Sequence, residues 1–362
     1  MNNAAPFIKK SINICQSTFV HRPKGCTINS YLHSEIVGFS KKNNVRQLMK
    51  SSIGEFEERL AGIKYLKKNS NNNKPIFQAF NLISGETINV NAESILLNHN
   101  LPIFDSMEHC DFTDSTGNAA HVRSDLVIEK GYMEFIERQS LIFSWLSKSP
   151  GEVVELEHIQ NEKLRTKIVH INSALKNLSF YSISILEGIY VIMCVGYGDK
   201  AFSVGLGTSW NLETALESSL DEFVMIFESV VCHKVYREGT DHNYKNMYIE
   251  MFYSMHISDF LDEISYLLNN RKLLKYYPYE DLISDNQLFN SIRKFKQRFD
   301  IDVYVSQMIS PYPENKIKIA KVFSPDAFPH INTLLYNPND FKISEKLTTN
   351  IYPNKFKMIP FA

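Results

Sequence analysis

The sequence predicts an α+β fold in a single domain that spans residues 1–362, with long acidic helices packed against pairs of strands. Two observations lead to this prediction. Apolar residues recur at helical spacing in several long stretches, and strand-like pairs lie between these stretches. The two kinds of segment alternate without the regular β-α-β rhythm of a parallel sheet, and no linker is strong enough to divide the chain.

The first helix is predicted over residues 45–66, where the apolar members at helical spacing are Leu48, Ile53, Phe56, Leu60, Ile63 and Leu66. The polar run 67–74 has no apolar position and therefore predicts a surface loop. Residues 76–90 then have the pattern of two strands joined at Ser84–Glu86.

A second helix is predicted over 124–148, with Ser124 or Asp125 as its N-cap. Residues 180–206 are rich in strand formers and have turns at 187–188 and 198–200. The third long helix is predicted over 212–231 with Asn211 as N-cap. The remaining expectations are helices at 248–268 and 288–299 and strands at 301–309 and 316–323.

Charge and cysteine content exclude several classes of protein. Lys plus Arg number 39 against 40 for Asp plus Glu, so no excess positive charge is available for nucleic acid. The five cysteines are scattered without a C-x-x-C pair, which argues against a disulfide framework and a zinc ribbon. The N-terminus has no secretory pattern, and the most apolar run, 189–195, is too short to span a bilayer. We expect a cytoplasmic protein with neither nucleic acid nor membrane as partner.

One acidic motif occurs twice, as E-F-x-E-R at Glu55–Arg59 and at Glu134–Arg138. In a helix its two glutamates share one face, and the arginine lies one turn from the first glutamate. Such a pattern is common on solvated helices, but both copies have apolar neighbours, and the third helix carries Asp221–Glu222 in an apolar setting. Partly buried carboxylates need cations, and Mg²⁺ held by carboxylates and phosphates is the obvious choice.

The two arginines suit phosphate oxygens, so acids, Mg²⁺ and arginines together suggest a nucleoside triphosphate. The sequence has no Walker A motif, and Gly205–Gly207 is too short for a dinucleotide fingerprint. A bound ATP would therefore use an unconventional site.

These residues resemble the YcaO family of ATP-dependent enzymes, whose ATP site combines S-x-x-x-E-x-x-E-R, a second E-x-x-E-R and a later acidic helix. The positions that match are Ser51, Glu55, Glu58, Arg59, Glu134, Glu137, Arg138 and Glu222. Three stretches are similar to the YcaO subunits of microcin-type synthases, namely 134–141, 324–326 and the tail 357–361.

The resemblance implies ATP- and Mg²⁺-dependent cyclodehydration of Cys, Ser or Thr in a ribosomally made precursor peptide, giving thiazoline or oxazoline rings. It implies that Mg²⁺ is held by Glu55, Glu58, Glu134 and Glu137, and that Arg59 and Arg138 contact phosphates. In related synthetases the C-terminus points into the active site, which makes the carboxylate of Ala362 a candidate catalytic base. The implied partners are the precursor peptide, a leader-binding E1-like subunit and an FMN-dependent azoline dehydrogenase.

Three alternatives stay open at this level. The family usually has an acid at the position of Leu126 and a glutamine at that of Met225, so a catalytically degenerate scaffold that binds the precursor or partner proteins is one alternative. A second is a family member that forms thioamides or amidines. In the third, the acids are ordinary surface residues.

Overall fold

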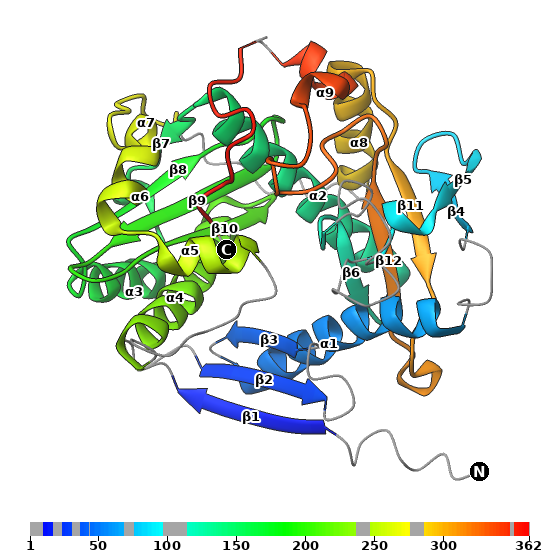
Figure 1. Cartoon of the computed structure of the whole chain (residues 1–362), viewed down its shortest axis with the longest axis horizontal. Coiled ribbons are helices and arrows are strands. Elements are labelled where there is room, and N and C mark those ends of the chain that lie inside the picture. The colour runs from blue at the N-terminus through cyan, green and yellow to red at the C-terminus, as the bar shows by residue number, and fades with distance from the viewer. Residues whose placement is uncertain are drawn as a thin grey trace. The chain divides into compact units, whose positions relative to one another are not determined.

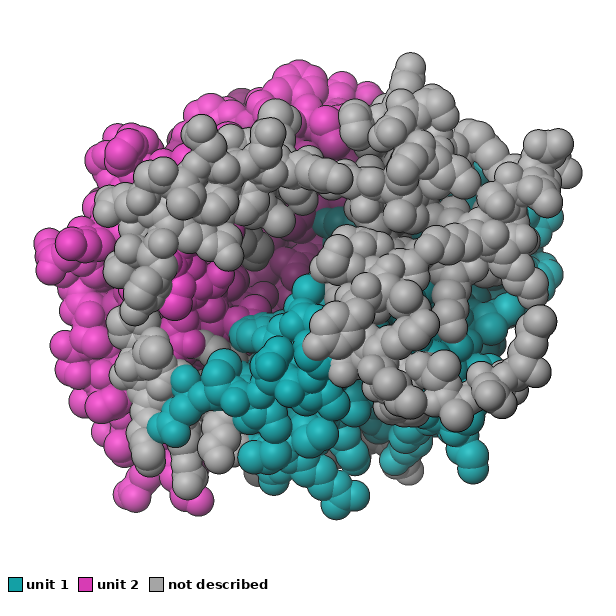
Figure 2. All heavy atoms as spheres, turned by 60° about the horizontal axis from the view of Figure 1, so that its bottom comes forward, with its two compact units in different colours: residues 1–17, 21–135, 301–325 teal, residues 18–20, 136–300, 326–362 magenta. Residues whose placement is uncertain are grey.

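The computed structural model describes residues 10–16, 24–30, 37–42, 44–68, 76–96, 114–236, 247–275, 286–347 and 351–361 (Figure 1). It confirms the α+β class. The chain divides into two compact units (Figure 2). Unit 1 contains residues 1–17, 21–135 and 301–325, and unit 2 contains 18–20, 136–300 and 326–362. The single domain over 1–362 stays a prediction.

Unit 1 begins with a three-stranded antiparallel sheet that the sequence did not predict. Its strands are β1 (Lys10–Gln16), β2 (Lys24–Ser30) and β3 (Val37–Lys42), followed by helix α1 (Val45–Lys68). The helix packs on β2 and β3 through Cys26, Ile28, Leu48, Phe56 and Leu60. A Cβ at Gly38 would lie 2.1 Å from the carbonyl oxygen of Ser52, so a glycine is needed where the strand meets the helix backbone.

The second sheet of unit 1 has five antiparallel strands in the order β5-β4-β11-β12-β6. Their bounds are Ile76–Asn81 for β4, Thr87–Asn91 for β5, Asn118–His121 for β6, Tyr304–Met308 for β11 and Lys318–Phe323 for β12. Its core includes Phe77, Ala79 and Ile319. The sheet brings β11 and β12, from the last quarter of the chain, beside β4 and β6, which lie between α1 and α2 (Ser124–Ser147) in the sequence.

Unit 2 contains a four-stranded antiparallel sheet in the order β10-β9-β8-β7. The strands are β7 (Glu152–Val153), β8 (Asn177–Ser182), β9 (Tyr190–Tyr197) and β10 (Phe202–Ser209), and α3 (Glu162–Asn172) lies between β7 and β8 in the sequence. Helix α4 (Leu212–Tyr236) packs on β10 and β9. Helix α4 and strand β10 approach so closely at Gly205 that a Cβ there would lie 2.2 Å from the backbone of Ser219 and of Phe223.

The remaining elements are short. They are α5 (Met247–Ser254), α6 (Ile257–Glu263), α7 (Ser265–Leu268), α8 (Gln287–Phe299), α9 (Lys342–Lys346) and the 3-10 helices Ala92–Ser94, Leu156–His158, Pro313–Asn315 and Pro338–Asp340. The continuous helix expected over 248–268 is therefore wrong, because His256 is extended and begins a new helix.

The long helices are where the sequence predicted them. The first and third extend beyond their expected ends, to Lys68 and Tyr236, and Asn211 caps α4 by accepting the N–H of Thr214 at 3.0 Å. Much of the loop expected over 67–74 falls outside the described residues. Among the helices that the structure describes, none has the length and apolarity needed to cross a membrane.

Candidate nucleotide and metal site

The first acidic signature lies on α1 beside β3. One oxygen of Glu55 accepts a hydrogen bond from Arg59 at 2.5 Å, and the other accepts the N–H of Phe39 at 2.7 Å. Arg59 also donates to the carbonyl oxygen of Val37 at 2.9 Å. Burial raises the pKa of Glu55, although Arg59 and the Phe39 N–H oppose this rise. Glu55 and Arg59 therefore connect the signature helix to the backbone of β3.

Glu58 lies one turn further along α1 than Glu55 and is partly buried. Burial raises its pKa to about 8, with a further contribution from the negative charge of Glu55, whereas Arg59 and Lys321 act in the opposite direction. A carboxyl group in this environment is stable as an anion only beside a cation. Ser51, the first residue of the signature, is exposed.

Lys321 on β12 is the cation that the two signatures share in unit 1. Its side chain is buried, and its ammonium donates to the carbonyl oxygen of Asp114 at 2.8 Å. Burial lowers the pKa of Lys321 to about 8, and the charges of Asp114, Glu134 and Glu58 oppose that effect. The charges of Glu58 on α1 and of Glu134 on α2 thus both act on this one lysine.

Sequence reasoning missed Lys321. The available signal was a lysine flanked by apolar residues in the run Ile319–Phe323. A lysine within an apolar strand is rarely buried unless it is paired.

The second half of the α2 signature belongs to unit 2. Thr208, at the end of β10, donates its hydroxyl to Glu137 at 2.7 Å. Burial raises the pKa of Glu137, while Arg138 and the Thr208 hydroxyl act to lower it. Thr208 was not predicted, and it supplies the hydrogen bond that fixes this carboxylate.

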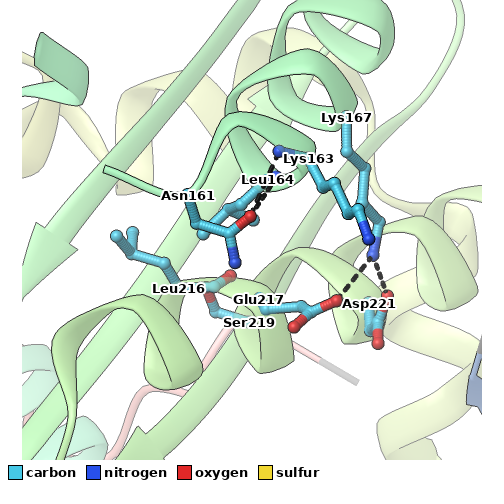
Figure 3. Close-up of polar contacts among 8 residues, drawn as sticks. All are labelled: Asn161, Lys163, Leu164, Lys167, Leu216, Glu217, Ser219 and Asp221. Atoms are coloured by element: carbon cyan, nitrogen blue, oxygen red, sulfur yellow. Dashed lines mark hydrogen bonds and ion pairs between the residues drawn. The ribbon is translucent and has the colours of Figure 1, made fainter. Parts of the chain in front are cut away.

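The two adjacent acids of α4 have different environments. Glu222 accepts the N–H of Leu206 on β10, and its charge helps to raise the pKa of the buried Cys194 on β9. Asp221 instead pairs with Lys167 of α3 at 2.5 Å, and both side chains are at least 87% buried (Figure 3). Glu217 lies 4.0 Å from the same ammonium. Asp221 is therefore used in packing α3 on α4, whereas Glu222 contacts the backbone of β10.

The structure also describes the two positions, Leu126 and Met225, at which the sequence departs from the family motif. Leu126 is partly buried, and its neighbour Asp125 is exposed and paired with Arg123. Asp125 consequently does not replace the acid that the family usually has at this position. Met225 is partly buried on α4.

The C-terminal tail packs within unit 2. The indole N–H of Trp145 donates to the carbonyl oxygen of Lys357 at 3.2 Å, and Asn354 donates to that of Trp145 at 3.0 Å. Met358, Ile359 and Phe361 are buried. Ala362, the candidate base, lies outside the described residues.

The donor set fits Mg²⁺ that arrives with phosphate. In the part of the chain that the structure describes, no group of three or more His, Cys, Asp or Glu side chains forms a ready-made metal site. Mg²⁺ does not require one, because it is usually bound by one or two carboxylates together with substrate phosphates. The partly buried Glu58, Glu134 and Glu137 are carboxylates of this kind.

Comparison with known proteins gives a consistent result. The family model for YcaO cyclodehydratases, described as ATP- and Mg²⁺-binding, matches residues 48–327. The microcin B17-processing protein McbD of Escherichia coli is 24% identical over 354 residues, which cover 91% of this chain and 84% of McbD.

Solved structures share the fold. A chain of the E. coli microcin synthetase McbBCD complex with pro-MccB17 bound superposes with a TM-score of 0.71 at 19% identity, covering 97% of this chain and 96% of that one. The YcaO protein of Methanopyrus kandleri bound with AMPPCP and Mg²⁺ gives a TM-score of 0.65 at 14% identity, with 88% and 86% coverage.

Proposed function

Because the chain belongs to the YcaO family, whose cofactors are ATP and Mg²⁺, we propose that it is the ATP-dependent cyclodehydratase subunit of an azole-forming synthase. Its substrate is a ribosomally made precursor peptide, in which Cys, Ser or Thr side chains close onto the preceding amide to form thiazoline or oxazoline rings. The similarity to McbD supports this assignment within the family.

The observation that carries the proposal is the environment of the signature glutamates. Burial raises the pKa of Glu55, Glu58 and Glu137, and each copy of the signature has its own arginine. Surface acids without a role would be solvated and would keep ordinary pKa values. Desolvated carboxylates of this kind favour the binding of a cation, which ATP brings as Mg²⁺.

The proposed roles are those that the resemblance to the family implies. Glu55, Glu58, Glu134 and Glu137 hold Mg²⁺, and Arg59 and Arg138 orient phosphate oxygens. Ser51 and Glu222 complete the nucleotide site. Bound ATP supplies the phosphoryl group that makes the amide oxygen a leaving group, so the protein mainly positions the reactants and neutralises charge.

The tail has a separate role in the proposal. A base is needed to remove a proton during ring closure, and the terminal carboxylate of Ala362 is our candidate. The burial of Met358, Ile359 and Phe361 supports the proposal only as far as Phe361, because it shows that the residues before Ala362 pack within unit 2.

We further propose that the chain works in a complex. The partners are a leader-binding E1-like subunit and an FMN-dependent dehydrogenase that oxidises azolines to azoles. The solved E. coli relative is itself a complex of McbB, McbC and McbD.

Calorimetric titration with ATP, with and without Mg²⁺, tests the nucleotide site. We expect Mg²⁺-dependent binding that is lost in Glu55→Gln and Glu137→Gln and kept in Glu345→Gln, whose residue is an exposed glutamate on α9. If neither the wild-type chain nor its assembled complex binds ATP, a catalytically degenerate scaffold is favoured. Leu126, which is not an acid, and the pairing of the neighbouring Asp125 with Arg123 are the observations that suggest this alternative. If product formation required a sulfur donor, a thioamide-forming enzyme would be indicated instead.

A further inference from the structure

We propose that unit 2 carries a second binding site, which takes an extended acidic segment of a peptide at a cavity beside helix α8. Its residues are different from those of the nucleotide site. Only the source of the segment, the precursor peptide, rests on the proposed function. The cavity receives an apolar side chain of the segment, and the exposed cations of α8 receive its carboxylates.

The cavity has a volume of about 560 Å³, which is a common size for a ligand-binding pocket. Its lining comes mainly from four parts of unit 2: the end of α2 with the residues that follow it, the turn 182–190, the segment 270–274 and the end of α8. The turn contributes three buried apolar residues, Ile183, Ile185 and Ile189. The interior of the cavity therefore suits an apolar side chain.

The shape of the cavity is fixed by contacts among its own walls. Gly151 has φ +65°, and a Cβ there would lie 2.2 Å from the carbonyl oxygen of Ser182. The side-chain amide of Asn270 donates to the carbonyl oxygen of Gly151 at 3.1 Å. Within the turn, the hydroxyl of Ser184 accepts the N–H of Val191 at 2.7 Å. These contacts form the cavity without a ligand, so binding does not have to order its walls.

The charges around the cavity leave one cation unpaired. Glu152 is neutralised by Lys272, since its carboxylate lies 3.0 Å from the lysine ammonium. Arg298 of α8 also lines the cavity, and its guanidinium lies 5.3 Å from the centroid of the Phe299 ring. In the described residues no carboxylate pairs with Arg298, so it can bind a carboxylate of a ligand through paired hydrogen bonds. The exposed Glu187 is on the turn, which places the acids of the ligand on the side of α8.

Helix α8 extends the positive charge beyond the cavity. Its cations are Arg293, Lys294, Lys296 and Arg298, and it contains no acidic residue. Lys296 pairs with Asp300 at 3.8 Å. Arg293 and Lys294 are exposed and, in the part of the chain that the structure describes, have no carboxylate partner. The helix dipole explains cations in the last turn of a helix, but these two residues precede the last turn.

The spacing of the α8 cations matches an extended peptide. Lys294 and Arg298 are four residues apart, so they share one face of the helix about 6 Å apart along its axis. In an extended chain, side chains two residues apart share one side at about 6.6 Å. A segment of the pattern acid–apolar–acid can therefore present both acids to α8, while its apolar side chain points away from α8 to the turn that lines the cavity. Nucleic acid would use the cations alone and leave the cavity without a ligand.

The test is the fluorescence anisotropy of a labelled peptide, Gly-Ser-Glu-Leu-Glu-Ser-Gly, titrated with the full chain in the absence of nucleotide. We expect binding that weakens with added salt, because salt screens exposed charges. Lys294→Gln and Arg298→Gln should each weaken it by about two- to fivefold, the range of an exposed ion pair. The matched control Lys318→Gln, an exposed lysine of unit 1, should leave it unchanged. Serine in place of the leucine of the peptide should also weaken binding.

An exchange of charge gives the decisive result. The double variant Lys294→Glu/Arg298→Glu should lose the acidic peptide and bind Gly-Ser-Lys-Leu-Lys-Ser-Gly instead. Both side chains are exposed, so we expect the circular dichroism spectrum of the wild type. An unchanged preference for the acidic peptide would overturn the proposal, as would a wild type that does not bind this peptide. Tighter binding of a single-stranded oligonucleotide or of anionic vesicles than of the peptide would overturn it too.

The kinetics of the assembled synthase test the source of the segment. The same double variant should raise the KM for the precursor peptide, while kcat and the affinity for ATP stay at the wild-type values. An unchanged KM would overturn the assignment to the precursor. Loss of the assembly in size-exclusion chromatography would show that α8 binds a partner subunit, and would also overturn it. A synthase that makes no product with ATP would refute the proposed function, whereas peptide binding is measured without nucleotide and would stand.

Discussion

Glu58 should make the metal-free protein less stable as the pH rises, and Glu58→Gln should remove the part of the pH dependence that Glu58 contributes. The folded-state pKa of Glu58 is about 8, against an ordinary value of 4.5. Between these values the folded state binds a proton that the unfolded state does not. The stabilisation is therefore complete below pH 4.5 and is lost as the pH rises to about 8.

The size of the effect follows from the same interval. The range from 4.5 to about 8 corresponds to about 4.8 kcal/mol, because each pH unit is worth about 1.36 kcal/mol. Glu58 is only partly buried, so this is an upper limit, and we expect about 2 kcal/mol or more. Lys321 does not confuse the measurement, since its lowered pKa of about 8 changes stability with pH only above that value.

Urea unfolding of the metal-free chain at pH 5, 6, 7 and 8 measures how the free energy of unfolding changes with pH. The difference in the free energy of unfolding between Glu58→Gln and the wild type should shift in favour of the variant as the pH increases. Glu345→Gln, which replaces an exposed glutamate, should run parallel to the wild type. Parallel curves for Glu58→Gln as well would show that this carboxyl group is solvated, and the argument for a desolvated site would fail.

Other predictions concern catalysis and packing. Glu137→Gln should abolish the ATP-dependent loss of water from the precursor peptide while leaving the circular dichroism spectrum intact, and an unchanged product mass would contradict its role. Lys167→Met should lower the free energy of unfolding by about 3–5 kcal/mol, because it removes the ammonium that pairs with the buried Asp221. The double variant Lys167→Met/Asp221→Leu should regain most of that loss in the same urea assay. A double variant as unstable as Lys167→Met would contradict this explanation of the loss. Gly205→Ala should prevent soluble folding, since its Cβ would lie 2.2 Å from the backbone nitrogen of Phe223, and a wild-type melting temperature would refute this close approach.

The long helices were predictable because their signals are local. Apolar spacing located α1, α2 and α4, and Asn211 marked the start of α4 through a cap that the structure contains. The first strand had no comparable signal, because β1 is largely exposed and lacks a buried apolar face. The expected helix over 248–268 failed for a different reason, as the extended backbone at His256 interrupts a periodic pattern that is otherwise helical.

The site was predictable only in part, for a related reason. Glutamates at i and i+3 are visible in a sequence, whereas the lysine that compensates them is far away in it. Lys321 lies beside Asn118 because β12 forms the neighbour of β6 in the sheet, and nothing within the run Ile319–Phe323 specifies that pairing. The spacing of the motif therefore identifies candidate acids, whereas the cation near them can be identified only from the folded structure.

The acid pair on α4 shows why residue type alone does not assign a role. Asp221 and Glu222 are adjacent, and a rotation of about 100° between successive helical residues directs them to different surroundings. Asp221 meets Lys167 of α3, whereas Glu222 meets the N–H of Leu206 on β10. The first acid is neutralised within the protein and has a packing role. The second accepts the N–H of Leu206, and its charge acts on the buried Cys194 of β9. Because Asp221 is paired with Lys167, Glu222 is the acid of this pair that we propose for the nucleotide site.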